Sequence, residues 1–291
     1  MSQLYRFTWF IGFLVFFFRN FLFCSEIQSV YFSTSAAQGE FISISFEKSS
    51  PKEKISVRFL DIECPCYQIK ESHWECFVGI PADAPIGTQN LNFIVDGSTK
   101  TILTAEILSK SFPVETLHLS QEKKSLLHRV DRPLELKKIR AALHTESETF
   151  LRDKKFLMPL QGKIEGLYGE RRMIEGKLQS GYHRGLDLGA LKGTLIKSSN
   201  HGTVLLAGKF IEEGNMVMID HGQGFITAYL HLSKILVRPG QKVKKGDAIG
   251  KVGSTGISTS NHLHFGAYIH STPIDPIYLL KYYEQTLSKS S

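Results

Sequence analysis

The sequence predicts a mainly β protein with two domains and a helical linker between them. Its 291 residues suffice for about two domains of roughly 150 residues each. Period-two runs of apolar and polar residues recur over 28–120 and again after 156, with Gly, Pro, Asp and Ser between them. The content of 42% hydrophobic and 22% charged residues excludes a mostly disordered chain. No apolar run reaches the ~18–20 residues of a membrane span, which excludes a polytopic membrane protein.

Residues 1–24 have the pattern of an export signal. Arg6 precedes ten uncharged residues, Trp9 to Phe18, and a basic start before a short apolar stretch is typical of a signal peptide. An uncleaved membrane anchor is the alternative, and Cys24 leaves lipidation open. We therefore expect an exported protein of the periplasm or cell envelope, whose only membrane contact is through this segment.

Residues 25–120 are predicted to form an immunoglobulin-like β-sandwich. Alternating apolar residues predict strands over 41–46, 55–59, 74–78, 91–95 and 101–104. Asp96-Gly97 is a hairpin turn signal, and the run 80–87 (IPADAPIG) resembles a strand-to-strand loop of an immunoglobulin-like domain. No residues in this part have catalytic spacing.

The three cysteines of this domain predict one disulfide and one free thiol. A Cys-x-Cys pair with a single further cysteine lacks the fourth ligand of a structural zinc site. Cys66 and Cys76 would lie almost opposite each other in a hairpin that turns near Glu71-Ser72, so we expect these two to pair.

The remaining chain divides into a linker, a second domain and a tail. Charge is dense over 121–155, and Asp131-Arg132-Pro133-Leu134 is typical of a helix start with Pro in the first turn, so we predict a helical linker. Residues 156–280 are predicted to form an all-β domain with strands over 203–207, 216–219, 225–230 and 263–269. Residues 281–291 are expected to be a tail, and the protein is expected to be a monomer.

The charge is unevenly distributed along the chain. Residues 25–150 hold 14 Lys+Arg against 17 Asp+Glu, a net charge of −3, and residues 151–291 hold 19 against 11, a net charge of +8. An anionic partner is therefore expected for the C-terminal half. The pI of 9.1 alone does not indicate nucleic acid, because no nucleic-acid-binding motif accompanies it. The opposite charges leave open whether residues 25–120 restrain access to the second domain or serve as a spacer.

Seven of the 11 histidines lie between 183 and 270. His262 and His264 share one face of a strand, about 6.6 Å apart, and can address one centre. His183 and Asp187 would be about 13 Å apart in a straight strand, so the chain must bend between them, which Gly185 permits. Two imidazoles and a carboxylate, with a fourth position for water, make a catalytic zinc site. Spacing does not decide which of His262 and His264 is the ligand.

Residues 156–278 resemble the lysostaphin-type (LytM-like) zinc metalloendopeptidase domain that acts on peptidoglycan. The resemblance covers about 40% of the chain. It is carried by the segments 182–189 (YHRGLDLG), 200–204 (NHGTV), 219–222 (IDHG), 229–233 (YLHLS), 237–247 (VRPGQKVKKGD), 253–256 (GSTG) and 262–265 (HLHF).

The resemblance implies one zinc ion per chain, bound by His183, Asp187 and His264. It implies that His231 and His262 are the catalytic pair, and that the substrate is a peptide bond in peptidoglycan stems or cross-links, cut for cell-wall remodelling. The alternative is a catalytically silent cell-wall regulator that activates other peptidoglycan hydrolases. The discriminating feature is the ligand set, and all five family positions are filled here.

Some positions depart from the family pattern or lie outside the expected site. Ser260-Asn261 stands where many members have Gly-Pro, and Gly266 stands where an acidic residue is frequent, which bears on substrate preference. His201 and His221 resemble framework positions, and His270 is expected at the surface.

Overall fold

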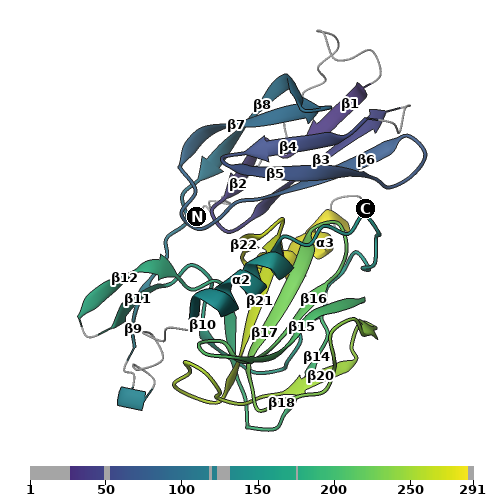
Figure 1. Ribbon diagram of the computed structural model, residues 1–291. Helices are drawn as coiled ribbons and strands as arrows, with labels where there is room; N and C mark the ends of the chain where they lie inside the picture. Colours follow the sequence, from purple (N-terminus) through teal and green to yellow (C-terminus); the bar gives the residue numbers. More distant parts are fainter. Residues whose placement is uncertain (1–26, 49–52, 118–119, 123–131, 175, 288–291) are drawn as a thin grey trace, which may run out of the picture.

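Two β domains, one stacked on the other, make up the computed structural model (Figure 1). The structure describes residues 27–48, 53–117, 120–122, 132–174 and 176–287. The predicted export signal, 1–24, lies outside the described residues. Within them, no helix is both long and apolar enough to span a bilayer.

The N-terminal domain is a strongly bent sheet of eight strands that wraps around its own apolar core. β5 joins the two halves, because its residues 62–65 pair with β4 and its residues 66–68 pair with β6. The pairing order is β1-β3-β6-β5-β4-β7-β8-β2. The strands are β1 (Ile27–Phe32), β2 (Ser35–Ala37), β3 (Phe41–Lys48), β4 (Ile55–Phe59), β5 (Ile62–Gln68), β6 (His73–Gly79), β7 (Gly87–Val95) and β8 (Ser98–Leu108).

The strands, the hairpin turn and the disulfide that the sequence predicts for this domain are confirmed. All five expected strands fall within β3, β4, β6, β7 and β8. Asp96 and Gly97 both have positive φ and connect β7 to β8, as a tight hairpin turn requires. Cys66 lies opposite Cys76 in the β5–β6 ladder and forms a disulfide with it, while Cys64 is a buried free thiol.

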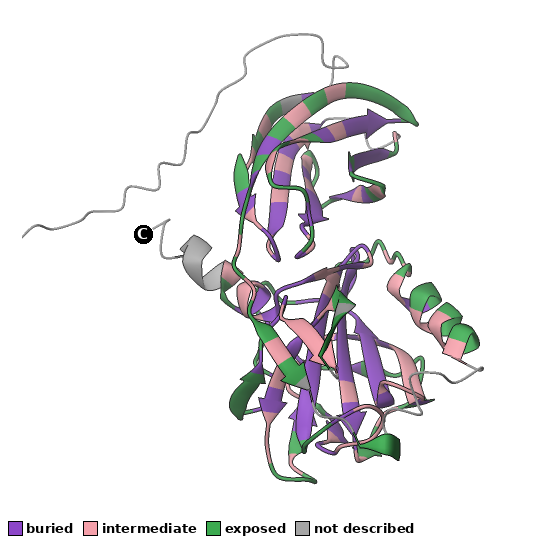
Figure 2. Ribbon diagram, turned by 90° about the vertical axis from the view of Figure 1, so that its left-hand side faces the viewer, coloured by how far each residue is buried: buried purple, intermediate pink, exposed green. Residues whose placement is uncertain are grey.

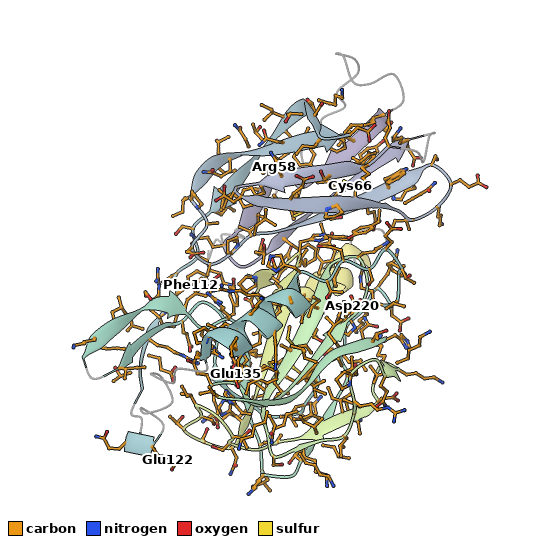
Figure 3. All side chains as sticks on the ribbon, viewed as in Figure 1. Arg58, Cys66, Phe112, Glu122, Glu135 and Asp220 are labelled. Carbon is orange, nitrogen blue, oxygen red and sulfur yellow. A yellow bond between two sulfur atoms is a disulfide. The ribbon has the colours of Figure 1, made fainter. Side chains whose placement is uncertain are left out.

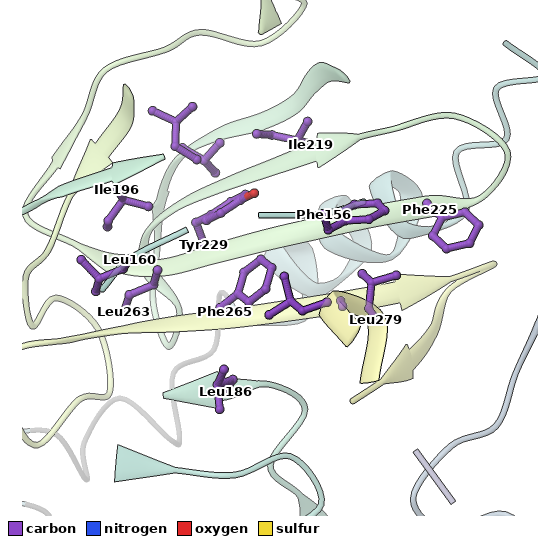
Figure 4. Close-up of a cluster of buried hydrophobic side chains, with 14 of the residues drawn as sticks. Phe156, Leu160, Leu186, Ile196, Ile219, Phe225, Tyr229, Leu263, Phe265 and Leu279 are labelled. Atoms are coloured by element: carbon purple, nitrogen blue, oxygen red, sulfur yellow. The ribbon is translucent and has the colours of Figure 1, made fainter. Parts of the chain in front are cut away.

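A second sheet forms the frame of the C-terminal domain. Its strands follow the order β10-β13-β21-β17-β16-β15-β19, and β22 pairs with β21. They are β10 (Lys163–Gly166), β13 (Leu186–Gly189), β15 (Gly202–Phe210), β16 (Gly214–Asp220), β17 (Phe225–Leu232), β19 (Lys242–Val243), β21 (His262–Ile269) and β22 (Thr272–Ile274). Alternation along these strands sends Leu263, Phe265 and Tyr229 into a dense core on one face (Figure 4).

A small sheet closes that core on its far side. It consists of β14 (Leu195–Lys197), β20 (Ala248–Lys251) and β18 (Lys234–Ile235). Ile196 and Ile249 are fully buried against the main core, and Phe156 and Leu160 join them from the chain before β10. The helix α3 (Pro276–Leu287) adds Leu279 and Leu280. It continues past residue 280, where we expected the domain to end, because its apolar face packs on this core.

The predicted linker helix is α2 (Arg132–Leu143), with Pro133 in its first turn. It packs on the opposite face of the main sheet, where Ala142 contacts a cluster that includes Met216 and Ala228, and its outer face is exposed (Figure 2). Arg132 pairs with Glu212 and Glu213 at 3.0 and 2.7 Å. The helix is therefore docked on the C-terminal domain.

A third sheet, β12-β11-β9, projects from the side of the C-terminal domain (Figure 1). It consists of β11 (Arg171–Ile174), β12 (Lys177–Tyr182) and β9 (Val114–Leu117). β9 comes from the chain just after the N-terminal domain and pairs with β11 in parallel register. The segment around 114–117 thus makes its ladder with the second half of the chain, before the boundary that we expected at residue 120.

The two domains meet through an aromatic interface. Phe41 of β3 contacts Phe225, Tyr278 and Tyr282 with ring centroids 6.1, 5.1 and 4.5 Å apart. Phe77 of β6 lies 4.9 Å from Phe225. Phe41 and Phe77 therefore belong to the core of the C-terminal domain as much as to their own sheet.

His270 is buried at this interface, so the prediction of a surface position is wrong. Its Nδ1 lies 2.9 Å from Glu146 Oε1, and the ring of Tyr67 stacks on it with centroids 6.1 Å apart. The hydroxyl of Tyr67 donates to the other oxygen of Glu146. The burial comes from the N-terminal domain, whose docking the local sequence around His270 does not reveal.

We expect Phe41→Ala to lower the free energy of unfolding by about 3–5 kcal/mol, because it removes a buried ring that both domains contact. Urea denaturation measures this. Ile102→Ala, at a position that is 54% exposed, is the control and should change stability by less than about 0.5 kcal/mol. A loss below about 1 kcal/mol at Phe41 would contradict the shared core.

Candidate metal centre

Three side chains meet where β13 pairs with β21. Asp187 lies directly opposite His264 in this antiparallel ladder, so the two side chains leave the same face of the sheet. Their neighbours Leu186, Leu188 and Leu263 point the other way, into the core. The alternation that buries the leucines therefore also presents the carboxylate and the imidazole together.

His183 reaches the same point because the chain bends before β13. Its Nε2 lies 3.0 Å from Asp187 Oδ1 and 2.9 Å from His264 Nδ1, and His264 Nδ1 lies 2.8 Å from Asp187 Oδ1. At Gly185, a Cβ would lie only 2.6 Å from both His264 Nε2 and the Phe265 carbonyl oxygen. Gly185 is thus required by a close approach, in agreement with the predicted bend.

The three groups fit a zinc ion. The Nδ1–H of His183 donates to the Leu167 carbonyl oxygen at 2.8 Å, which leaves Nε2 with its lone pair facing the carboxylate. Donor atoms around one tetrahedral zinc lie roughly 3.3–3.5 Å apart for bonds of about 2.0–2.2 Å, close to the spacing seen here. Three donor atoms that lie so close together would repel one another unless a cation lay between them. Two imidazoles and one carboxylate are a common ligand set for zinc.

The electrostatics keep these groups in the forms that bind a metal. Burial alone would raise the pKa of Asp187, but the imidazoles of His183 and His264 outweigh it and hold that pKa well below its usual range. Burial lowers the pKa of His264, and the nearby carboxylate offsets only part of that change. Asp187 is therefore ionised and His264 neutral near pH 7.

Arg172 of β11 adds a positive charge at the edge of the site. Its Nη2 lies 3.5 Å from Asp187 Oδ2, the carboxylate oxygen that faces away from the histidines. It also stands opposite Glu115 in the β9–β11 ladder. Sequence reasoning missed Arg172, because an arginine in a polar hairpin gives no signal of what its strand will lie beside.

His262 and His264 share the site face of β21, as predicted, but they differ in distance. His262 Nε2 is 3.8 Å from Asp187 Oδ1, a full ångström farther than His264 Nδ1. The Nδ1 of His262 lies 3.1 Å from the Ser260 carbonyl oxygen and 3.2 Å from Ser258 Oγ. The geometry favours His264 as the ligand and leaves His262 beside it.

His231 enters the site through an irregularity in β17. Tyr229 and Leu232 are both in the core, although strict alternation would put Tyr229 and His231 on the same face. His231 has a left-handed backbone, with φ of 64°, and the β16–β17 register shifts at this end. The strained residue turns its side chain out of the core and toward His262, with ring centroids 5.0 Å apart.

The hydrogen bonds of His231 set its tautomer. Its Nδ1–H donates to the Thr255 carbonyl oxygen at 2.9 Å, so Nε2 is the bare nitrogen. Burial and the neighbouring His264 and His262 lower the pKa of His231 to about 3. The imidazole is therefore neutral near pH 7.

The other histidines of this half lie outside the cluster. His201 contacts Asp153 at 3.4 Å near the surface. His221 is fully buried, bonded to the His201 carbonyl and to Thr227, and its burial lowers its pKa to about 4. Both positions agree with the framework role expected for them.

The segment that contains these residues is similar to known proteins. Residues 181–276 match peptidase family M23. An uncharacterized metalloprotease of Buchnera aphidicola is 45% identical over 94 residues, which cover 32% of this chain and 25% of that protein. Peptidoglycan DD-endopeptidase ShyA of Vibrio cholerae is 32% identical over 147 residues, which cover 48% of this chain and 34% of that protein. The chain thus spans about a quarter to a third of these relatives.

A solved structure extends the similarity beyond the matched segment. The crystal structure of a putative peptidase M23 from Pseudomonas aeruginosa has a TM-score of 0.62 and 26% identity. The alignment covers 84% of this chain and 94% of that one. Coverage of this size includes residues of both β domains.

We expect His183→Ala, Asp187→Ala or His264→Ala to weaken zinc binding at least about 100-fold, because each removes an atom that would bind the metal directly. Loss of a group that only hydrogen-bonds a ligand already lowers metal affinity about 10–100-fold. Zinc content after dialysis measures this. His201→Ala, which lies outside the cluster, should keep its metal. If His262→Ala loses zinc and His264→Ala retains it, the assignment within His262-Leu263-His264 is reversed.

His231→Ala and His262→Ala should keep zinc and lose about 10²–10⁴-fold of the hydrolysis rate, the usual contribution of a positioned acid or base. Metal content and turnover are measured on the same preparation. Zinc loss in both variants would show that these histidines hold the metal instead.

Proposed function

We propose that this chain is a zinc-dependent metalloendopeptidase that hydrolyses peptide bonds in peptidoglycan stems or cross-links, because residues 181–276 match peptidase family M23. The observation that carries the proposal is the cluster of His183, Asp187 and His264 with two further histidines beside it. ShyA, a relative by sequence, is named as a peptidoglycan DD-endopeptidase, which supports this substrate. The role is cell-wall remodelling.

His183 Nε2, Asp187 Oδ1 and His264 Nδ1 would hold one zinc ion. When bound, zinc polarises a substrate carbonyl and lowers the pKa of a water molecule toward about 7. Asp187 and His264 keep 13% and 11% of their side-chain surface accessible, whereas the side chain of His183 is almost fully buried. The core lies on the other side of the strands.

His231 and His262 would move the proton during hydrolysis. Each directs its Nδ1 to a backbone carbonyl oxygen, which leaves Nε2 to accept a proton from the attacking water. The low pKa of His231, about 3, keeps its ring neutral near pH 7, so Nε2 carries no proton before the reaction. The protonated ring can also stabilise the negative charge that develops on the carbonyl oxygen.

The alternative is a catalytically silent regulator that activates other wall hydrolases. DipM of Caulobacter vibrioides, 36% identical over 148 residues, is named a cell division protein. The complete set of five site residues favours the enzyme. Mass spectrometry of muropeptides from sacculi digested with the wild type and with His231→Ala distinguishes the two. Zinc-loaded wild type that releases no peptide fragments would support the regulator.

We further propose that the protein is exported to the periplasm or cell envelope and acts as a monomer. An exported location gives access to peptidoglycan, and the pattern of residues 1–24 supports it. Signal cleavage is tested by N-terminal sequencing of the protein recovered from the envelope fraction.

A basic pair on the small sheet of β14, β20 and β18 would bind the anionic wall polymer. Lys234 lies directly opposite Lys251 in the β18–β20 ladder, an unfavourable like-charge pair, and Lys234 follows His231 by three residues. Among the described residues neither lysine has an ion pair. An anionic ligand bound to the two lysines would relieve this repulsion.

Lys234→Gln/Lys251→Gln should weaken binding to sacculi roughly three- to fivefold at low salt, since an exposed charge contributes up to ~1 kcal/mol. Hydrolysis of a short uncharged peptide should not change. Lys70→Gln/Lys100→Gln, which removes two exposed charges from the N-terminal domain, is the matched control. Equal sacculus binding by both double variants would contradict this surface.

A further inference from the structure

The loop between β10 and β11 holds His183 from three directions. The Leu167 carbonyl oxygen accepts the Nδ1–H of His183 at 2.8 Å. The Glu170 carbonyl oxygen accepts the backbone N–H of His183, and the Gly169 N–H donates to the His183 carbonyl oxygen, both at 2.8 Å. The position and the tautomer of this proposed ligand therefore depend on residues 167–170.

Tyr168, in the middle of that loop, is anchored to the N-terminal domain. Its hydroxyl accepts the backbone N–H of Ala82, in the β6–β7 loop, at 3.1 Å and donates to the Pro273 carbonyl oxygen of β22 at 2.8 Å. Only 3% of Tyr168 is exposed. Burial raises the pKa of Tyr168, so the hydroxyl keeps the proton that it donates.

Three further groups fit closely around the Tyr168 ring. Phe112, which lies at the junction of the two domains (Figure 3), contacts it edge-on with centroids 6.3 Å apart. Tyr182, the residue before His183, contacts it at 5.6 Å. On the side of the N-terminal domain, a Cβ on Gly39 would lie 2.8 Å from Tyr168 Cε1, so this glycine lets the backbone of the N-terminal domain touch the ring.

We propose that Tyr168 is a positioning residue through which the N-terminal domain fixes His183 and thereby sets the zinc affinity of the C-terminal domain. Leu167 and Gly169, the neighbours of Tyr168, both bond to His183, so a displacement of Tyr168 displaces these partners. The inference rests on the proposed zinc site. The N-terminal domain would then help to build the metal centre. This role differs both from covering the site and from acting as a passive spacer.

A purely structural role for Tyr168 predicts something different. Loss of its hydroxyl would then lower the melting temperature, as at any buried interface tyrosine, and leave zinc affinity unchanged. Tyr67 provides the matched comparison, since it is also buried at the interface and its hydroxyl donates across it to Glu146, away from the loop.

The first experiment compares Tyr168→Phe with Tyr67→Phe in the full chain. Zinc dissociation constants are measured by competition with a chromophoric chelator, and the visible absorption of the Co²⁺-loaded protein reports ligand geometry. We expect Tyr168→Phe to raise the zinc dissociation constant about three- to tenfold, at or below the low end for groups that hydrogen-bond a ligand directly, because Tyr168 acts on His183 through its neighbours. The Co²⁺ spectrum should change as well. Tyr67→Phe should lower the melting temperature but keep the zinc constant within about twofold of wild type.

The second experiment perturbs Tyr168 from the N-terminal domain alone. Gly39→Ala and Gly87→Ala impose the same backbone strain, because the two glycines have φ of 91° and 93°. An added Cβ meets the Tyr168 ring at Gly39 and meets no atom within 4 Å at Gly87. We expect Gly39→Ala to weaken zinc binding severalfold and Gly87→Ala to leave it unchanged.

The results separate the inference from the proposed function. If wild type binds zinc, and Tyr168→Phe and Gly39→Ala bind it as tightly as their controls do, the positioning role is overturned and the zinc site stands. If wild type binds no zinc, both are overturned. Weaker zinc binding in these two variants alone, with a changed Co²⁺ spectrum, supports the inference.

Discussion

The register of β13 against β21 is the constraint on which the candidate site depends. It sets Asp187 opposite His264, and a shift of β13 by one residue would send Asp187 into the core and bring Leu186 and Leu188 out. Leu186, Leu188, Leu263 and Phe265 are all essentially inaccessible, so the hydrophobic core enforces this register. The energy that orders the site therefore comes from burying apolar side chains on the other face of the same two strands.

Backbone carbonyl oxygens provide the next layer of order. Those of Leu167, Thr255 and Ser260 each lie at the Nδ1 of one histidine and so orient His183, His231 and His262. The local sequence does not show where the carbonyl oxygen of a loop residue will point, because packing sets its position. The loop of Leu167 is anchored by Tyr168, and the backbone N–H of His231 donates to the carbonyl of Glu213, whose side chain pairs with Arg132 of α2.

Much of this could be predicted from the sequence, and the limits have physical causes. Period-two alternation located the strands, and the Cys66–Cys76 pairing followed from a hairpin, because both depend on contacts between chain neighbours. His183, Asp187, His231, His262 and His264 were identified by spacing and family resemblance, and the structure brings all five together. Arg172, the buried position of His270 and the β9–β11 pairing depend on contacts between distant segments. Local patterns cannot report such contacts.

The interface between the domains argues for one rigid unit. The net charges of −3 and +8 suggested an electrostatic attraction, but the contact surface is mainly aromatic, with Phe41 and Phe77 inserted into the core of the other domain. Among the residues that the structure describes, Lys110 and Asp275 form an ion pair across it at 2.7 Å. Salt screens and weakens exposed charge pairs, whereas it has little effect on the burial of apolar side chains. Salt should therefore act on the exposed lysines of the C-terminal domain and leave the docking of the two domains intact.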